Sequence, residues 1–278
     1  EPVSLTNIPH LQDVTTMMSI LGRLGVSLTV DERLGIELDA RALTSCQAPY
    51  ELVRTMRASI LVLGPLLARM GKAEVSLPGG CAIGTRPVNL HVRGLEALGA
   101  EVRVEEGYIK ASAPKGLKGA RIFFDTVTVT GTENIMMAAT LTPGITAIVN
   151  AALEPEVFDL IAILKKMGAK ISLEAPATIY IEGVATLSAV EHAIIPDRLE
   201  AGALILAAAI TGGSVYLPQA HAYSMDVFLM KLEEMGHELI IGAQGVGITL
   251  KATKEPRATS FKTAPYPGFP TDLQAPFM

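Results

Sequence analysis

Apolar residues recur at helical spacing four times along the chain, and each of these segments ends at a glycine. The glycines are Gly25, Gly99, Gly168 and Gly236, and they lie 74, 69 and 68 residues apart. The first segment shows the pattern most clearly, with apolar residues at Val14, Met17, Met18, Leu21 and Leu24. A glycine just past the last apolar position is typical of a helix C-terminus. Two short strands of alternating pattern follow, for example residues 100–104 and 108–112, and predict a hairpin after the helix.

A second set of helices, at residues 58–70, 134–141 and 201–210, is apolar on nearly every face. We therefore expect these helices to be buried on all sides. Each leads through a glycine into a strand, so that apolar helix, strand, loop, amphipathic helix and two strands form a unit of about 70 residues. This repeat predicts an α/β protein of packed units and not a doubly wound sheet. The chain would hold parts of about four units, the first and the last incomplete.

Composition narrows the function classes. The chain has 278 residues, 49% of them hydrophobic, which suffices for a sizeable core in one large or two ordinary domains. The chain has 18% charged residues, a net charge of -5 and no dense basic run. The sequence therefore predicts no surface for nucleic acid or membrane, but it is compatible with binding of a small anionic ligand. The apolar windows are shorter than the roughly 18 residues that span a bilayer. Residue 1 does not begin a signal peptide.

The two cysteines lack the paired spacing of a disulfide framework or a zinc site, which favours a reducing, cytoplasmic location. We expect no metal and no cofactor. Cys81 lies in the loop LPGGCAIGTRP, where three glycines within six positions permit close backbone approach. Most free cysteines are small buried hydrophobes. Here Arg86 and a nearby helix N-terminus favour a reactive thiolate. We interpret Cys46, which has no such neighbours, as structural.

Two further residues are candidates for a site. Arg57 lies near the start of an apolar helix, where an anionic ligand could be its partner, although an ion pair or a surface position is the commoner explanation. Asp272 follows a segment with three prolines in six residues and stands at or next to a helix start. It is either an ordinary carboxylate at a helix N-terminus or, if it faces a cleft, a general base.

The segment LPGGCAIGTRPVNLH closely resembles the reactive loop of UDP-N-acetylglucosamine enolpyruvyltransferases, and TMRAS, PDRLEAG and FPTDLQA match other segments of that family in order. The resemblance covers the whole chain. It implies transfer of the enolpyruvyl group of phosphoenolpyruvate to the 3-hydroxyl of UDP-N-acetylglucosamine, by addition and elimination with release of phosphate. This is the first committed step of peptidoglycan synthesis, on which cell shape and division depend.

The resemblance also implies roles for particular residues. Cys81 matches the general acid that fosfomycin alkylates, and Asp272 matches the base that takes the proton of the sugar hydroxyl. Arginines 57 and 86 match those around the phosphate-bearing substrates. Two segments match those lining the uridine and diphosphate site: Arg86, Pro87, Val88, Asn89 and Leu90, then Thr128, Val129 and Thr130. Two of these depart from the family pattern, Asn89 standing where aspartate is common and Thr130 where glycine is common.

The implied fold is an inside-out α/β barrel of two similar domains built from βαβαββ units, with residues 1–195 in the first and 196–278 beginning the second. On that pattern further family segments, with a lysine, an asparagine and another arginine of the substrate site, are expected outside residues 1–278, so the chain alone would be impaired or inactive. Two alternatives remain open. One is a 3-phosphoshikimate 1-carboxyvinyltransferase-like enzyme, which has this architecture but not this cysteine loop, and the other is a non-catalytic paralogue that binds the sugar nucleotide. A P-loop is disfavoured because no Gly-Lys-Ser/Thr follows the glycines.

Overall fold

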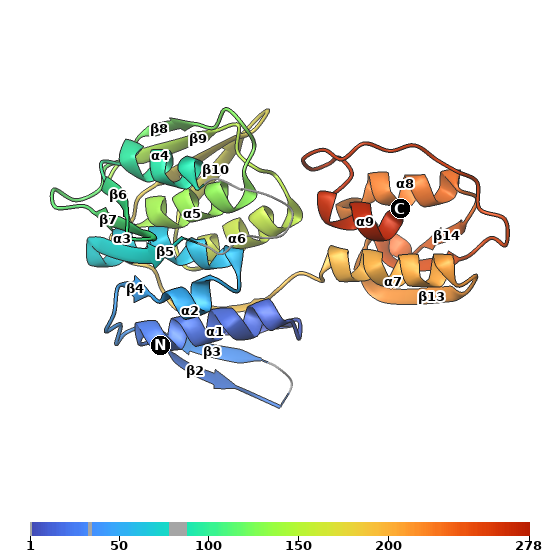
Figure 1. The fold of residues 1–278 in the computed structure, drawn as a ribbon, viewed down its shortest axis with the longest axis horizontal. Helices are drawn as coiled ribbons and strands as arrows, with labels where there is room; N and C mark the ends of the chain where they lie inside the picture. Colours follow the sequence, from blue (N-terminus) through green and yellow to red (C-terminus); the bar gives the residue numbers. More distant parts are fainter. Residues whose placement is uncertain (1, 33–34, 78–87) are drawn as a thin grey trace. The chain divides into compact units, whose positions relative to one another are not determined.

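The computed structural model describes residues 2–32, 35–77 and 88–278. The chain divides into two compact units. Unit 1 comprises Glu1–Ala152 and Glu156–Ile194, and unit 2 comprises Leu153–Pro155 and Ile195–Met278. Figure 1 shows the elements of each unit, which we describe separately.

Two sheets of unit 1 have the same strand order and directions. The first runs in the order β4 (Gln47–Ala48), β5 (Lys72–Ser76), β7 (Tyr108–Ser112), β6 (Glu101–Glu105). The second runs in the order β8 (Arg121–Phe123), β9 (Ile145–Val149), β11 (Thr178–Glu182), β10 (Lys170–Glu174). In both sheets the first two strands are parallel and the other neighbours antiparallel. The sequence prediction of repeated units in an α/β protein is therefore confirmed.

The third sheet of unit 1 repeats this order with strands from opposite ends of the sequence. It runs β12 (Glu191–Ala193), β1 (Val3–Thr6), β3 (Ile36–Asp39), β2 (Ser27–Val30). The parallel pair is β12 with β1, in register Leu5 to His192. The side-chain amide of Asn7 (Nδ2) also donates to the carbonyl of Ile194 at 2.8 Å. The start of the chain and the segment that precedes unit 2 thus complete one sheet.

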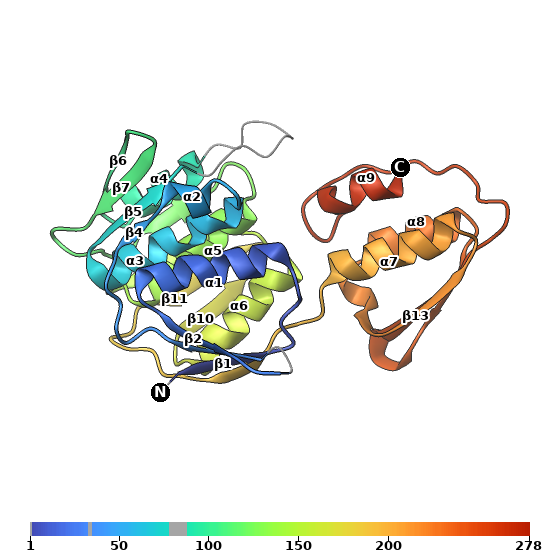
Figure 2. The same cartoon turned by 60° about the horizontal axis from the view of Figure 1, so that its bottom comes forward.

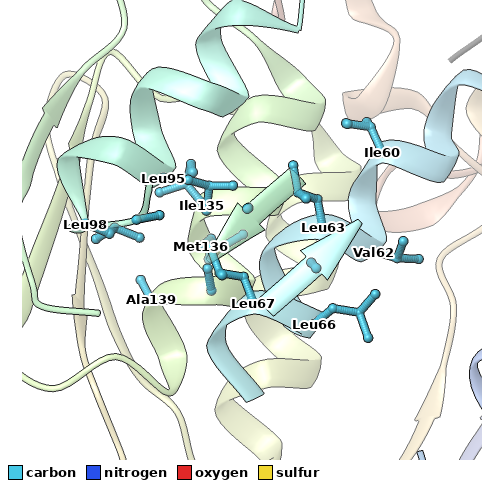
Figure 3. Packing of buried hydrophobic residues seen from close by; sticks show 14 of the residues in the cluster. Ile60, Val62, Leu63, Leu66, Leu67, Leu95, Leu98, Ile135, Met136 and Ala139 are labelled. Carbon is cyan, nitrogen blue, oxygen red and sulfur yellow. The ribbon is translucent and has the colours of Figure 1, made fainter. Parts of the chain in front are cut away.

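Helices fill the interior of unit 1 and the sheets lie around them, as Figures 1 and 2 show. These helices are α1 (Gln12–Leu24), α2 (Tyr50–Val53), α3 (Leu63–Met70), α4 (Asn89–Ala97), α5 (Val129–Thr140) and α6 (Pro155–Lys166), with the 3-10 helix η1 (Arg57–Val62) before α3. Leucines of α3 and α4 meet Ile135 and Met136 of α5 in the core (Figure 3). Both α5 residues are fully buried. Helices inside and sheets outside are the arrangement that the resemblance implied, although the described strands form separate sheets and not one closed barrel.

The four glycines of the repeat end their helices as predicted. Each has a left-handed backbone, with φ of 100° at Gly25, 95° at Gly99, 103° at Gly168 and 95° at Gly236. A side chain at such an angle is strained, and glycine avoids that strain. The hairpins predicted after two of these glycines are also present, as β6–β7 and β10–β11.

The prediction of one continuous helix over residues 58–70 is wrong. The segment divides into η1 and α3. Pro65 accounts for the division, because it has no amide hydrogen for the carbonyl of Leu61 and its ring would collide with that carbonyl in an α-helix. An α-helix can therefore begin only just before Pro65, and the preceding turns adopt the tighter 3-10 form.

Unit 2 contains one further sheet and its helices. Its elements are α7 (Arg198–Ile210), β13 (Ser214–His221), η2 (Ala222–Ser224), α8 (Asp226–Glu234), β14 (Glu238–Ile241), η3 (Ala243–Gly245), β15 (Val246–Lys251), η4 (Thr271–Leu273) and α9 (Gln274–Phe277), with strand order β13-β15-β14. Phe228 and Phe269 are buried in its core with ring centroids 5.9 Å apart.

The apolar composition of α7 predicted burial on every side. Within residues 1–278, only one face of α7 is buried. Ala201, Gly202 and Ile205 are buried, but Leu204 is 48% and Ile210 88% exposed. The sheet of unit 2 and η4 cover one face of the helix. On that face the side chain of Leu273 packs against Gly202. Among the described residues of the whole chain, no helix combines the length and the apolar character needed to cross a membrane.

Candidate functional site

The predicted site residues fall at the beginnings of several elements. Cys81, Arg86 and Pro87 lie outside the described residues. Arg57 is the first residue of η1, Val88 precedes α4, and Asn89 and Leu90 begin that helix. Thr128 precedes α5, and Val129 and Thr130 begin it. Asp272 lies in η4 of unit 2.

The start of α5 is held by threonine side chains. Thr128 is the N-cap, and its hydroxyl oxygen accepts from the amide of Gly131 at 3.2 Å. The hydroxyl of Thr132 donates to the carbonyl of Thr128 at 2.7 Å and accepts from the amide of Ala152 at 3.0 Å. Such bonds satisfy groups that the first turn of a helix leaves unpaired. A β-carbon at Gly131 would collide with the side chain of Thr128, so this cap requires glycine there.

The start of α4 is held mainly by packing. Val88 and Leu90 are half-buried against the core, whereas Asn89 is exposed. Farther along the helix, Arg93 forms an ion pair of 3.2 Å with Asp125, which precedes the cap of α5. Both side chains are more than half exposed, so the pair contributes little stability. It joins α4 to the residues that precede α5.

A buried polar chain joins α3, α4 and α5 beneath these segments. The amide of Gly64 donates to Oδ1 of Asn134 at 2.7 Å, and Nδ2 of Asn134 lies 3.1 Å from the carbonyl oxygen of Ile60 and 3.0 Å from Nδ1 of His91. Nε2 of His91 lies 3.3 Å from the hydroxyl oxygen of Thr130. His91 is 2% and Asn134 0% exposed. These hydrogen bonds thus lead from the interior of unit 1 to Thr130, a predicted site residue.

Sequence reasoning did not single out His91 or Asn134, which lie beneath the predicted site residue Thr130. A signal was present, because Asn134 is a polar residue in a segment that is otherwise nearly apolar. A polar side chain in a buried helix needs a hydrogen-bonding partner. Which partner it has depends on the packing of α4 against α5, which the spacing of residues does not reveal.

The electrostatics of this region keep His91 neutral. Burial lowers its pKa, and the positive charge of Arg57 lowers it further, to about 4. Both causes disfavour the charged imidazolium. The histidine affected in this way is the one whose Nε2 lies 3.3 Å from the hydroxyl oxygen of Thr130.

Asp272 has a different setting. It is exposed in the first turn of η4, after Pro270, and the neighbouring Leu273 is buried and anchors the turn. Its role as a base stays a prediction. Within the described parts of the chain, no three His, Cys, Asp or Glu side chains gather closely enough to hold a metal ion.

The repeated units and their buried helices define an enolpyruvyl transferase fold. The structure superposes on the enolpyruvyl transferase NikO from Streptomyces tendae with a TM-score of 0.85 at 21% identity, over 99% of this chain and 66% of that one. It also resembles the EPSP synthase from Acinetobacter baumannii, with a TM-score of 0.69 at 17% identity, over 95% of this chain and 61% of that one. At these identities the likeness concerns the fold.

Sequence comparison gives the family. The chain belongs to the EPSP synthase (3-phosphoshikimate 1-carboxyvinyltransferase) family, whose model matches residues 1–278. It is 55% identical over 276 residues to a UDP-N-acetylglucosamine 1-carboxyvinyltransferase from Saccharophagus degradans. The match covers 99% of this chain and 66% of that protein, so the chain spans just under two thirds of its length.

Proposed function

We propose that this chain forms part of an enzyme that moves the enolpyruvyl group of phosphoenolpyruvate to the 3-hydroxyl of UDP-N-acetylglucosamine, with release of phosphate. The observation that carries the proposal is the 55% identity, over nearly the whole chain, to a relative named for this activity. The motif around Cys81 supports the same assignment. The enzyme would act in the cytoplasm in peptidoglycan synthesis, with fosfomycin as a covalent inhibitor at Cys81.

In the proposed reaction, Cys81 donates a proton to the methylene carbon of phosphoenolpyruvate while the sugar 3-hydroxyl oxygen bonds to the adjacent carbon. Asp272 takes the hydroxyl proton. A proton then leaves the new methyl group and inorganic phosphate departs, which leaves the enol ether. Arg57 and Arg86 would hold phosphate and carboxylate oxygens, for which the guanidinium fork is suited. The segments at residues 86–90 and 128–130 would line the sugar nucleotide.

The test is an assay of phosphate release from phosphoenolpyruvate. It uses a protein that contains this chain and is as long as its relatives, with UDP-N-acetylglucosamine or 3-phosphoshikimate as acceptor. We expect turnover with the sugar nucleotide. Cys81→Ser should lower the rate by about a hundredfold or more, which is typical for loss of a general acid. Cys46→Ser is the matched control, because Cys46 is half-buried beside β4 in unit 1, and it should leave the rate unchanged. Mass spectrometry should find fosfomycin on Cys81 and not on Cys46.

Each alternative has its own outcome. Turnover with 3-phosphoshikimate and none with UDP-N-acetylglucosamine would assign the protein to the other branch of the family. Saturable binding of UDP-N-acetylglucosamine without phosphate release would identify a non-catalytic binding protein. Full activity of Cys81→Ser would refute the proposed proton donor.

A further inference from the structure

The polar chain beneath Thr130 has only one consistent arrangement of hydrogens. The amide of Gly64 can only donate and the carbonyl of Ile60 can only accept, so these two backbone groups fix which end of the Asn134 amide is oxygen and which is nitrogen. The two hydrogens of Nδ2 are then directed at the carbonyl of Ile60 and at Nδ1 of His91. Nδ1 of His91 must therefore accept and carries no hydrogen.

The remaining ring nitrogen follows from this assignment. A neutral imidazole carries one hydrogen, which must lie on Nε2. Nε2 lies 3.3 Å from the hydroxyl oxygen of Thr130, so the ring donates and the hydroxyl oxygen accepts. Protonation of Nδ1 would bring its hydrogen against those of the Asn134 amide. The neutral tautomer with hydrogen on Nε2 is therefore the one that the surrounding contacts permit.

The hydroxyl hydrogen of Thr130 is consequently not directed at His91. Thr130 is half-buried in the first turn of α5, in the segment that resembles the lining of a nucleotide site. A hydroxyl whose oxygen already accepts a buried hydrogen bond is suited to donate its own hydrogen to a phosphate oxygen. The departure from glycine at this position thus adds a hydroxyl donor, and the bond from His91 directs the hydrogen of that hydroxyl away from the ring.

We propose that His91 and Asn134 are positioning residues that orient the hydroxyl of Thr130 as a hydrogen-bond donor to the diphosphate of the sugar nucleotide. This inference rests on the proposed function for the identity of the ligand. The buried chain spans α3, α4 and α5, so it transmits the packing of the helical core to one contact of the substrate. Thr130 then contributes to the selection of a diphosphate-linked sugar over an acceptor without a diphosphate.

The first test measures how tightly the full-length protein binds UDP-N-acetylglucosamine. KM for this substrate is measured at saturating phosphoenolpyruvate, and its dissociation constant is measured by titration calorimetry. Thr130→Val should raise both constants by about tenfold, the usual effect of losing a hydrogen bond to a charged group, while KM for phosphoenolpyruvate changes much less. Thr130→Ser should restore most of the loss. Thr140→Val is the matched control, because that hydroxyl bonds to the carbonyl of Met137 at the other end of α5.

The second test concerns the buried chain. His91→Asn, which removes the donor at the Nε2 position, should raise KM for the sugar nucleotide in the native background and have little further effect beside Thr130→Val. His91→Gln, which keeps a donor near Thr130, should be milder. In the native protein at neutral pH, the ¹⁵N chemical shifts of His91 should show hydrogen on Nε2 and none on Nδ1.

The outcomes separate this inference from the proposed function. A native enzyme with normal turnover, but unchanged sugar-nucleotide affinity in Thr130→Val, would overturn the inference alone. Hydrogen on Nδ1, or equal effects of His91→Asn with and without the Thr130 hydroxyl, would also overturn it. A protein without turnover would refute the proposed function, and calorimetry and ¹⁵N shifts would still decide whether His91 orients a donor toward UDP-N-acetylglucosamine.

Discussion

The buried imidazole of His91 makes the stability of unit 1 depend on pH. Its pKa in the folded protein is about 4, below the ordinary value of 6.5, so between these values the unfolded chain binds a proton that the folded chain does not. Falling pH therefore favours unfolding across this range. The full shift corresponds to a loss of about 3 kcal/mol by pH 4. Burial also lowers the pKa of His237, which adds a loss of the same sign in unit 2.

Hydrogen exchange of the α5 amides at about pH 7 and about pH 4.5, corrected for intrinsic exchange, measures this loss in unit 1. His91→Asn should be less stable than the native protein at neutral pH but should lose less stability on acidification. The control is His10→Asn, because His10 is exposed. If the native protein and His91→Asn lost equal stability on acidification, His91 would not be the group that titrates.

At the scale of single residues, the sequence identified the positions by motif but not their surroundings. Arg57 is a candidate because of its place near an apolar helix, yet its electrostatic effect on His91 arises only in the folded chain, since the two residues are more than 30 positions apart. Asn134 was visible only as a polar residue among apolar ones. Hydrogen-bond partners across a core are set by packing geometry, and spacing along one chain does not contain that geometry.

At the scale of the elements, two glycines in helices have opposite roles. A β-carbon at Gly64 of α3 would collide with the backbone and side-chain oxygens of Asn134, so α3 and α5 approach each other through this glycine. Gly22 of α1 is exposed, and a β-carbon there would meet only the side chain of Leu28 at 3.6 Å. Gly64→Ala should cost about 2–3 kcal/mol through overpacking. Gly22→Ala should stabilise the protein by about 0.5–1 kcal/mol.

Thermal denaturation of the two variants beside the native protein checks this pair. Opposite shifts of the midpoint are expected, although both changes add one methyl group to a helix. A neutral Gly64→Ala would show that α3 and α5 can separate without loss, although a β-carbon at Gly64 would collide with Asn134. It would also show that the bond between Gly64 and Asn134 is not required.

The elements themselves were predictable where one local rule decided them. The glycines that end α1, α4, α6 and α8 combine apolar spacing with a left-handed backbone, and both signals lie within a few residues. The prediction was wrong at residues 58–70, because Pro65 interrupts the α-helix that the apolar composition favours. In residues 1–278, α7 is buried on one face, because a helix that is apolar on all faces is buried only where neighbouring elements cover those faces.

At the scale of the whole chain, the repeat predicted the units but not how the first one is completed. Strands β8 and β9 lie close in sequence, on either side of α5, and β4 and β5 likewise flank α2, η1 and α3. The equivalent pair, β12 and β1, is separated by almost the entire length of unit 1. A repeated sequence pattern shows which segments resemble one another. It does not show that β1 pairs with β12, which lies far from it in the sequence. The boundary of unit 1 at Ile194 is consequently a tertiary feature.

This closure can be tested at a single backbone amide. The amide of Ser4 donates to the carbonyl of Val190 at 2.9 Å, at the start of the parallel pair. Ser4→Pro removes that donor from a strand with neighbours on both sides, which a sheet tolerates poorly. We expect amides of residues 191–194 to lose hydrogen-exchange protection, while those of β9 and β11 keep it. Ser4→Val, which retains the amide, should preserve protection in both places. Equal protection of β12 in the two variants would mean that unit 1 is held closed by its helices and not by the pairing of its two ends.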